Sequence, residues 1–337
     1  MATLVRVQEI EHEIGESGRF SLRVTSADVE LRAVDGPWAR VRATYDLSAG
    51  SDAEADDLFE RAQLRATSGP GELDLEEPSS GLGGIGALAR ILTGIGREVV
   101  DRRIEAEVPR GAEVRFNGVS AELTAIGFRG EQRYRTVSGD LVVTETGGDV
   151  RLRSVSGDAS VRADDPLALE ATTVSGDLSI VAPTLGRVRI NTVSGDAEVE
   201  GELGHDAQHR VDTVSGDLSL GISGGLILEV RGLSSEVKVR LPHRSEGSRD
   251  RRRYVIGDGR AELLFSSMSG DVEVHAADRL DRWGRVAAGA PTSQAPAAVT
   301  PSAPTERAGP VDELEILRAV ERGEMSVEEA ARLLEGR

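Results

Sequence analysis

The feature that most constrains this chain is a five-residue pattern, Thr-Val-Ser-Gly-Asp, that recurs with small changes through the sequence. Counting serine to serine, with weaker copies at Ser120 and Ser234 included, gives steps of 18, 18, 19, 19, 21 and 19 residues. A constant period of this size is typical of solenoids and other stacked-repeat folds. The full Ser-Gly-Asp triplet occupies Ser138, Gly139, Asp140, Ser156, Gly157, Asp158, Ser175, Gly176, Asp177, Ser194, Gly195, Asp196, Ser215, Gly216, Asp217, Ser269, Gly270 and Asp271.

Each repeat reads as strand, turn, strand. The first and third residues after each Asp are apolar, and this spacing of two predicts strands with one buried face. A meander of antiparallel hairpins and a stack of parallel coils both fit the unit. The sameness of successive units favours stacking, with equivalent side chains about 4.8 Å apart. We therefore predict an all-β fold, a single-chain β-solenoid that resembles a parallel β-helix, with coils of about 19 residues.

Before the repeats, the same alternation covers residues 20–45, so half-buried strands are expected there as well. Ser51 and Glu54 form a capping-box pattern that predicts a short helix after them. Residues 82–100 follow helical spacing and predict an amphipathic helix inserted in the solenoid. That helix would cover an open end of the stack or dock on a membrane surface or a partner.

After the repeats the composition changes. Proline, alanine, serine and threonine dominate residues 285–310, which predicts a disordered linker. Residues 311–337 then carry two short helical patterns separated by Gly323, which predicts a helical hairpin. The domains expected are a solenoid over 1–284, with its clearest repeats in 104–276, the linker, and the two-helix module. Its candidate partner-binding residues, for a protein partner or for self-association, are Leu314, Leu317, Val320, Val327, Leu333 and Leu334.

The repeat also breaks between Glu236 and Ser269, a gap of 33 residues that contains a basic cluster in 244–253. A solvated loop is the simpler interpretation, and a docking site for an acidic partner is the more specific alternative. The cluster comprises Arg244, Arg249, Arg251, Arg252 and Arg253.

The net charge, the lack of cysteine and the N-terminal sequence limit the classes of partner, site and location that are expected. A net charge of -18 disfavours nucleic acid and anionic membrane as main partners, and leaves a cationic partner open. The absence of Cys excludes disulfides, thiolate metal sites and thiol nucleophiles. Because no secretory signal pattern is seen, we expect a cytoplasmic protein. Residues 82–100 are too interrupted by charges to span a membrane, although peripheral contact is open.

The aspartates at equivalent positions are the most suggestive chemical feature. We expect the Ser and Asp side chains to bond turn amides, while Gly supplies a positive φ. Calcium along the aspartates is one alternative, and a polysaccharide-acting β-helix enzyme is another. An active site would require a unique cluster, whereas these carboxylates repeat evenly. We therefore assign no catalytic, metal or cofactor-binding residues, and no enzymatic activity.

The chain resembles a known family in several ordered motifs. Val108-Pro109-Arg110-Gly111, the repeated Thr-Val-Ser-Gly-Asp turns and Ile256-Gly257-Asp258-Gly259 look like the bacterial putative-adhesin family of β-strand-repeat proteins. The resemblance covers roughly residues 20–276 and implies a β-solenoid without established enzymatic activity. Residues 315–330 are similar to a two-helix module of cell-envelope stress proteins, where it precedes the repeats. Together these imply a non-enzymatic, adhesin-like scaffold for binding or assembly, linked to envelope stress.

Overall fold

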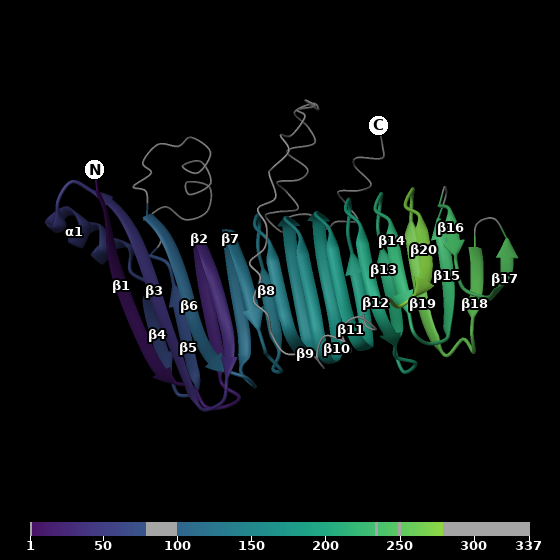
Figure 1. Cartoon of the computed structure of the whole chain (residues 1–337), viewed down its shortest axis with the longest axis horizontal. Helices are drawn as coiled ribbons and strands as arrows, with labels where there is room; N and C mark the ends of the chain where they lie inside the picture. The colour runs from purple at the N-terminus through teal and green to yellow at the C-terminus, as the bar shows by residue number, and fades with distance from the viewer. Residues whose placement is uncertain (1, 79–99, 233–234, 249–250, 279–337) are drawn as a thin grey trace, which may run out of the picture. The chain divides into compact units, whose positions relative to one another are not determined.

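The computed structural model describes residues 2–78, 100–232, 235–248 and 251–278. The chain divides into two compact units, Met1–Ala277 and Asp278–Arg337, and every element below belongs to the first. The described residues form one helix, α1 (Asp52–Ala62), and the following strands (Figure 1): β1 (Ala2–Glu13), β2 (Arg19–Val34), β3 (Trp38–Ala49), β4 (Arg65–Gly69), β5 (Glu72–Glu76), β6 (Val100–Pro109), β7 (Glu113–Ile126), β8 (Gln132–Arg135), β9 (Leu141–Ser156), β10 (Ala159–Ser175), β11 (Leu178–Asn191), β12 (Ala197–Leu203), β13 (Gln208–Asp212), β14 (Leu218–Ile222), β15 (Leu226–Gly232), β16 (Val237–Val239), β17 (His243–Ser248), β18 (Arg251–Ile256), β19 (Ala261–Ser267) and β20 (Val272–Ala276).

The strands pair in two ladders that share the long bent strands. Ladder 1 includes the segments that follow each Ser-Gly-Asp corner, and its order is β1-β3-β6-β2-β7-β9-β10-β11-β12-β14-β20-β16. Ladder 2 includes the segments that precede each corner, and its order is β4-β5-β2-β7-β8-β9-β10-β11-β13-β19-β15-β18-β17. Pairing is parallel from β6 to β16 and from β5 to β15. The sheet is therefore open and solenoid-like, as the repeat predicts.

The core consists of the side chains that point inward from these ladders. The first and third residues after each corner Asp are all buried, with relative exposures of at most 4%. Burying an aliphatic side chain contributes about 1.5 to 3 kcal/mol, so the regular spacing of apolar residues stabilises each coil against the next. The prediction is confirmed for Leu141, Val143, Ala159, Val161, Leu178, Ile180, Ala197, Val199, Leu218, Leu220, Val272 and Val274.

The last coils do not stack in sequence order. In ladder 1, β14 pairs with β20, and β20 in turn pairs with β16. In ladder 2, β19 likewise lies between β13 and β15. The coil that ends with Asp271 is therefore inserted between the coils of Ser215 and Ser234. The chain passes to the end of the stack and then returns to fill the gap.

The basic segment is part of this end. Its strands β17 and β18 form an antiparallel hairpin, and β18 pairs antiparallel with β15. The hairpin therefore forms the end of ladder 2. The interpretation of this segment as a solvated loop is wrong for these strands. Arg252 also donates to the Ser235 carbonyl oxygen at 2.7 Å, while Arg249 lies outside the described residues.

At the opposite end, ladder 1 becomes antiparallel through β1, β3 and β6. The predicted short helix is present as α1. The Ser51 hydroxyl accepts a hydrogen bond from the Glu54 amide at 3.3 Å, and the Glu54 carboxylate accepts one from the Gly50 amide at 2.7 Å. Ala55 and Leu58 are buried against the strands. The predicted helix start at Ser51 is confirmed, although the Glu54 carboxylate bonds the amide of Gly50 and not the Ser51 amide that a capping box uses.

Several predictions concern residues that the structure does not describe. The amphipathic helix expected over 82–100 falls almost entirely within residues 79–99, and Val100 is the first residue of β6 rather than the end of a helix. The linker over 285–310 and the two-helix module over 311–337, with its candidate partner-binding residues, also lie outside. Among the described residues, no helix has the length and apolar character needed to cross a membrane.

Candidate functional site

The coil corners are built around glycines that allow very close backbone contact. Gly139, Gly157, Gly176 and Gly195 adopt φ between +118 and +134°, as predicted. A Cβ on Gly176 would lie 2.2 Å from the carbonyl oxygen of Gly157 in the preceding coil. Every triplet glycine shows the same conflict, and it persists where the positive φ prediction fails, at Gly216 and Gly270. Close approach between coils is therefore the general reason for glycine here.

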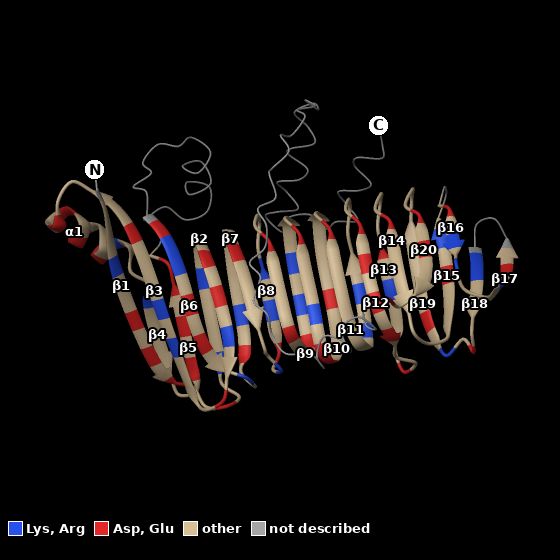
Figure 2. Ribbon diagram, viewed as in Figure 1, with Lys and Arg blue, Asp and Glu red and all other residues tan. Residues whose placement is uncertain are grey.

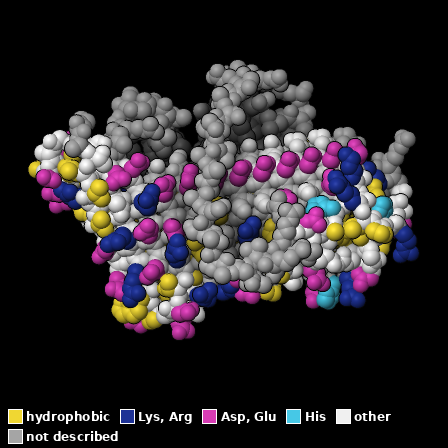
Figure 3. Space-filling model, viewed as in Figure 1, with side chains coloured by type: hydrophobic (Ala, Val, Ile, Leu, Met, Phe, Trp, Pro, Cys, Tyr) yellow, Lys and Arg dark blue, Asp and Glu magenta, His cyan; other side chains and the backbone are white. Residues whose placement is uncertain are grey.

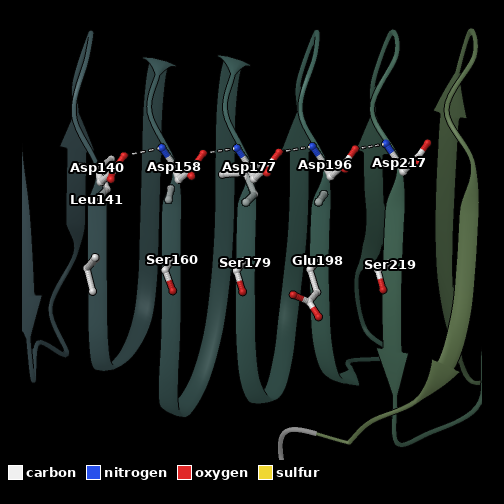
Figure 4. Close-up of a pocket in the computed structure, with 14 residues that line it drawn as sticks. Asp140, Leu141, Asp158, Ser160, Asp177, Ser179, Asp196, Glu198, Asp217 and Ser219 are labelled. Atoms are coloured by element: carbon white, nitrogen blue, oxygen red, sulfur yellow. Dashed lines mark hydrogen bonds between the residues drawn. The ribbon is translucent and has the colours of Figure 1, made fainter. Parts of the chain in front are cut away.

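The aspartates of successive corners are joined in one chain of hydrogen bonds (Figure 4). Each backbone N–H of an aspartate is donated to the Oδ1 atom of the aspartate in the neighbouring coil. The contacts Asp158 to Asp140, Asp177 to Asp158, Asp196 to Asp177 and Asp217 to Asp196 all measure 2.9 Å. The chain continues through Asp271, which donates to Asp217 at 2.8 Å. We call Asp140, Asp158, Asp177, Asp196, Asp217 and Asp271 the aspartate row.

These bonds refine the predicted role of the triplet. Aspartate does bond an amide, but that amide belongs to the next coil, so the side chain links coils. The serine prediction is wrong in its detail, because the corner serines pair mainly through their backbones, as in the bond from the Ser138 amide to the Val119 carbonyl at 2.7 Å. The threonine before them closes some turns instead. The Thr213 hydroxyl, for example, accepts from the Gly216 amide at 2.8 Å.

A shallow groove of about 440 Å³ runs beside the aspartate row on the outer face of ladder 1. Its floor holds the second residue after each aspartate, including Ser160, Ser179, Glu198 and Ser219. These side chains are mostly small, so the carboxylates stand along one side of an open channel. The space-filling view shows acidic side chains aligned across several coils (Figure 3).

The electrostatics of the aspartate row differ from those of other charged surfaces. On β1, β3 and β6 several carboxylates have a basic neighbour, as in Glu11–Arg40 at 2.8 Å and Glu9–Arg42 at 2.9 Å (Figure 2). Within the described part of the chain, no Lys or Arg forms an ion pair with a member of the aspartate row. Like charges one strand apart repel by roughly 1 kcal/mol in water. The amide hydrogen bonds offset part of that cost.

The row is not arranged as a cation cage. No group of three or more His, Asp or Glu side chains in the described ranges is placed to hold a metal ion. The carboxylates lie in a line, and each already accepts an amide hydrogen bond. A calcium ion prefers six to eight converging oxygens, so this geometry gives the calcium alternative no support.

The histidines have separate structural environments. His209 is 1% exposed; its Nε2 atom lies 2.8 Å from the Gly204 carbonyl oxygen, and Nδ1 accepts from the Val188 amide at 3.2 Å. Burial lowers its pKa, with the Gly204 contact acting in the opposite direction. This histidine therefore fixes the second turn of its coil. The sequence shows it as one of a scattered set, and its burial carries no distinct sequence signal.

A second buried polar cluster was missed by sequence reasoning. Gln132 and Thr146 are fully buried, and the Gln132 Oε1 atom accepts from the Thr146 hydroxyl at 2.9 Å and from the Tyr134 hydroxyl at 3.1 Å. Burial raises the pKa of Tyr134. The cluster supplies hydrogen-bond partners to backbone carbonyl groups of the irregular turn opposite the corners. It has no opening to solvent, so its role is structural.

Comparison with known protein families gives a match over most of the repeats. The family model described as Toastrack DUF4097 matches residues 10–219, more than half of the chain. No curated protein matches.

Solved structures give only distant similarities. A protein titled a putative cell adhesion protein from Clostridium sporogenes is 8% identical, with a TM-score of 0.27, and the match covers 80% of this chain and 99% of that one. A putative adhesin from Bacteroides fragilis is 11% identical, with a TM-score of 0.28, and covers 80% and 97%. A putative lipid binding protein from Parabacteroides distasonis is 13% identical, with a TM-score of 0.31, and also covers 80% and 97%. These TM-scores are too low to support an inference about function. On the match to the family model, the chain belongs to the Toastrack DUF4097 family.

Proposed function

We propose that the protein is a non-enzymatic β-solenoid scaffold with an adhesin-like role, which binds a cationic partner along the aspartate row. The observation that carries the proposal is the hydrogen-bonded chain of carboxylates from Asp140 to Asp271. It holds identical charged groups in one line on a rigid stack. Regular repetition of one group supports binding of an extended partner rather than catalysis at a unique centre.

The charge of the row suggests the chemistry of the partner. The carboxylates repel one another, and no described Lys or Arg neutralises them. A partner that brings lysine or arginine side chains into the groove would replace this repulsion with attraction. The net charge of -18 would also steer a cation toward the protein and speed association at low salt.

Several weak ion pairs to successive aspartates can together give a high affinity. An exposed ion pair contributes about 0.2 to 1 kcal/mol, which is too little for specific binding by itself. Contacts to successive coils by one extended chain become intramolecular after the first, so the total affinity rises with their number. We therefore expect long cationic peptides to bind much more tightly than short ones.

The test uses a fluorescent oligolysine peptide and the full chain, with affinity read from fluorescence anisotropy. Asp158→Asn, Asp177→Asn and Asp196→Asn are combined, because asparagine keeps an oxygen for the next coil's amide but removes the charge. Three lost pairs should weaken binding about tenfold, using about 0.5 kcal/mol per pair and 1.4 kcal/mol per factor of ten.

A second triple variant controls for net charge. Glu16, Asp57 and Glu60 are exposed, lie away from the groove and have no ion-pair partner among the residues described. Changing them to Gln, Asn and Gln removes the same three charges. The proposal requires this control to bind like the original protein. Equal weakening in both variants would show that only net charge matters, and the aspartate row would then have no special role.

The envelope-stress link is part of the same proposal and rests on the resemblance of residues 315–330, which lie outside the described residues.

A further inference from the structure

Strand β1 is an unusual edge. Its twelve residues, Ala2–Glu13, all pair with β3 on one side, and no other described strand pairs with its opposite side. The ladders end elsewhere in much shorter strands, with β16 of three residues, β4 of five and β17 of six. Natural proteins usually blunt long edges with lysine, proline, bulges or short strands, because an open edge offers N–H and C=O groups to another strand. The β1 strand contains no lysine, proline or glycine.

The outer face of β1 is also apolar over its first half. Val5 is 53% exposed and Val7 is 45% exposed, the highest values among the large hydrophobic residues that the structure describes. The second half of the same face carries Glu9, Glu11 and Glu13. The strand therefore presents an apolar end and an acidic end along one edge.

Contacts on the inner face hold β1 in place. The Gln8 side chain donates to the Leu64 carbonyl and accepts from the Leu64 amide, both at 2.9 Å. The Nε2 atom of His12 lies 3.0 Å from the Gly69 carbonyl oxygen. Arg6 forms an ion pair with Asp56 of α1 at 2.8 Å. Side-chain contacts thus fix the strand from within, while no strand of the described residues pairs with its outer edge, so pairing with another strand would cost little ordering entropy.

We propose that β1 pairs with β1 of a second copy of this chain, in an antiparallel arrangement whose two-fold axis passes near Val5 to Val7. Such a dimer would join the two ladder 1 sheets at their N-terminal ends (Figure 1). A two-fold interface uses the same surface on both copies, which suits a single edge strand.

The charge pattern of β1 favours a second copy of β1 as the partner and an antiparallel pairing. In the antiparallel arrangement Val5 and Val7 of one copy face the valines of the other, and the glutamates of the two copies lie at opposite ends of the interface. The two Arg6 side chains come near each other at the axis on the inner face, where each is already paired with Asp52 and Asp56 of its own chain. A parallel arrangement would instead set each glutamate beside its equivalent, and like charges directly opposite are destabilising. Cross-strand valines lie about 4.5 to 5.5 Å apart at Cβ, close enough to bury each other.

The first experiment measures mass by sedimentation velocity of the full chain, from about 1 to 100 μM, a range that brackets the affinity of a small interface. We expect the original protein to shift from monomer to dimer across this range. The variant V5K/V7K should stay monomeric, because lysine at an edge opposes pairing. The control V142K changes an exposed valine of the groove and should dimerise like the original.

The second experiment does not depend on the lysine variant. The chain has no cysteine, so single variants T3C, V5C, V7C and E13C each report one position. Under mild oxidation, V5C or V7C should form disulfide-linked dimers faster than E13C, which lies far from the two-fold axis. Three results would overturn the proposal: a protein that is monomeric throughout the range, a V5K/V7K variant with the same mass as the original, or faster cross-linking at position 13. Oligolysine binding is measured separately, so the dimer and the aspartate row can fail independently.

Discussion

Replacing Gly176 by alanine tests whether close contact between coils determines the corner. The new Cβ would lie 2.2 Å from the Gly157 carbonyl oxygen, whereas ordinary contacts begin at 3.4 Å, so the coils would have to separate locally by about 1.2 Å. A φ of +127° adds strain of about 1 to 3 kcal/mol for a residue with a Cβ. Overpacking adds a further 1 to 3 kcal/mol or so. The sum is about 2 to 6 kcal/mol, a large part of the 5 to 15 kcal/mol that typically stabilises a folded protein.

The assay is urea unfolding of the full chain, followed by circular dichroism. Gly186→Ala is the matched control, because this glycine is exposed, has no positive φ, and its nearest atom would be 3.7 Å away. We expect the control to unfold near the original midpoint and Gly176→Ala far below it. Gly216→Ala separates the two causes, since its Cβ would clash at 2.0 Å without a positive φ. A midpoint for Gly176→Ala equal to that of the control would refute the close-contact explanation.

Two further predictions concern single side chains. Asp177→Ala should lower the free energy of unfolding by about 0.5 to 1.5 kcal/mol, because the Asp196 amide loses its acceptor. Asp177→Asn should be at least as stable as the original protein, because it keeps an acceptor and reduces the repulsion in the row. Thermal melts that rank the two variants alike would contradict this. For His209, burial depresses the folded pKa below the ordinary value of about 6.5, so its contribution is complete above that pH and is lost as pH falls through the folded pKa. Urea midpoints at pH 7.5 and 5.5 should therefore fall more for the original protein than for His209→Gln, and parallel changes would show that His209 does not titrate in this range.

The sequence predicted the coil in detail because the coil is a local pattern. Alternation of two places Leu141 and Val143 on the inner face, and both are buried. The capping box at Ser51 likewise specifies a helix start through neighbours three residues apart. Such features depend on residues close in the chain, so one sequence is enough to find them.

The candidate site was only partly predictable. The even spacing of the aspartates showed that they would form a row, and their exposure follows from their corner position. Their hydrogen-bond partners could not be predicted from the sequence. Asp140 accepts from the amide of Asp158, eighteen residues later, and that contact depends on how adjacent coils align. The edge properties of β1 were also hidden, since a strand pattern does not show which side of the strand stays unpaired.

The sequence by itself determined the repeat, the inward-facing residues and the glycine-containing corners, because periodicity and turn chemistry act within one coil. Only the tertiary structure decided the order of the coils. Equivalent coils offer nearly equivalent stacking surfaces, so the coil of Ser269 fits beside that of Ser215 as well as the coil of Ser234 would. Sequence distance does not distinguish these neighbours. The β17–β18 hairpin pairs with β15 at the end of ladder 2, and that placement sends the chain outward before the last coil returns to complete the aspartate row.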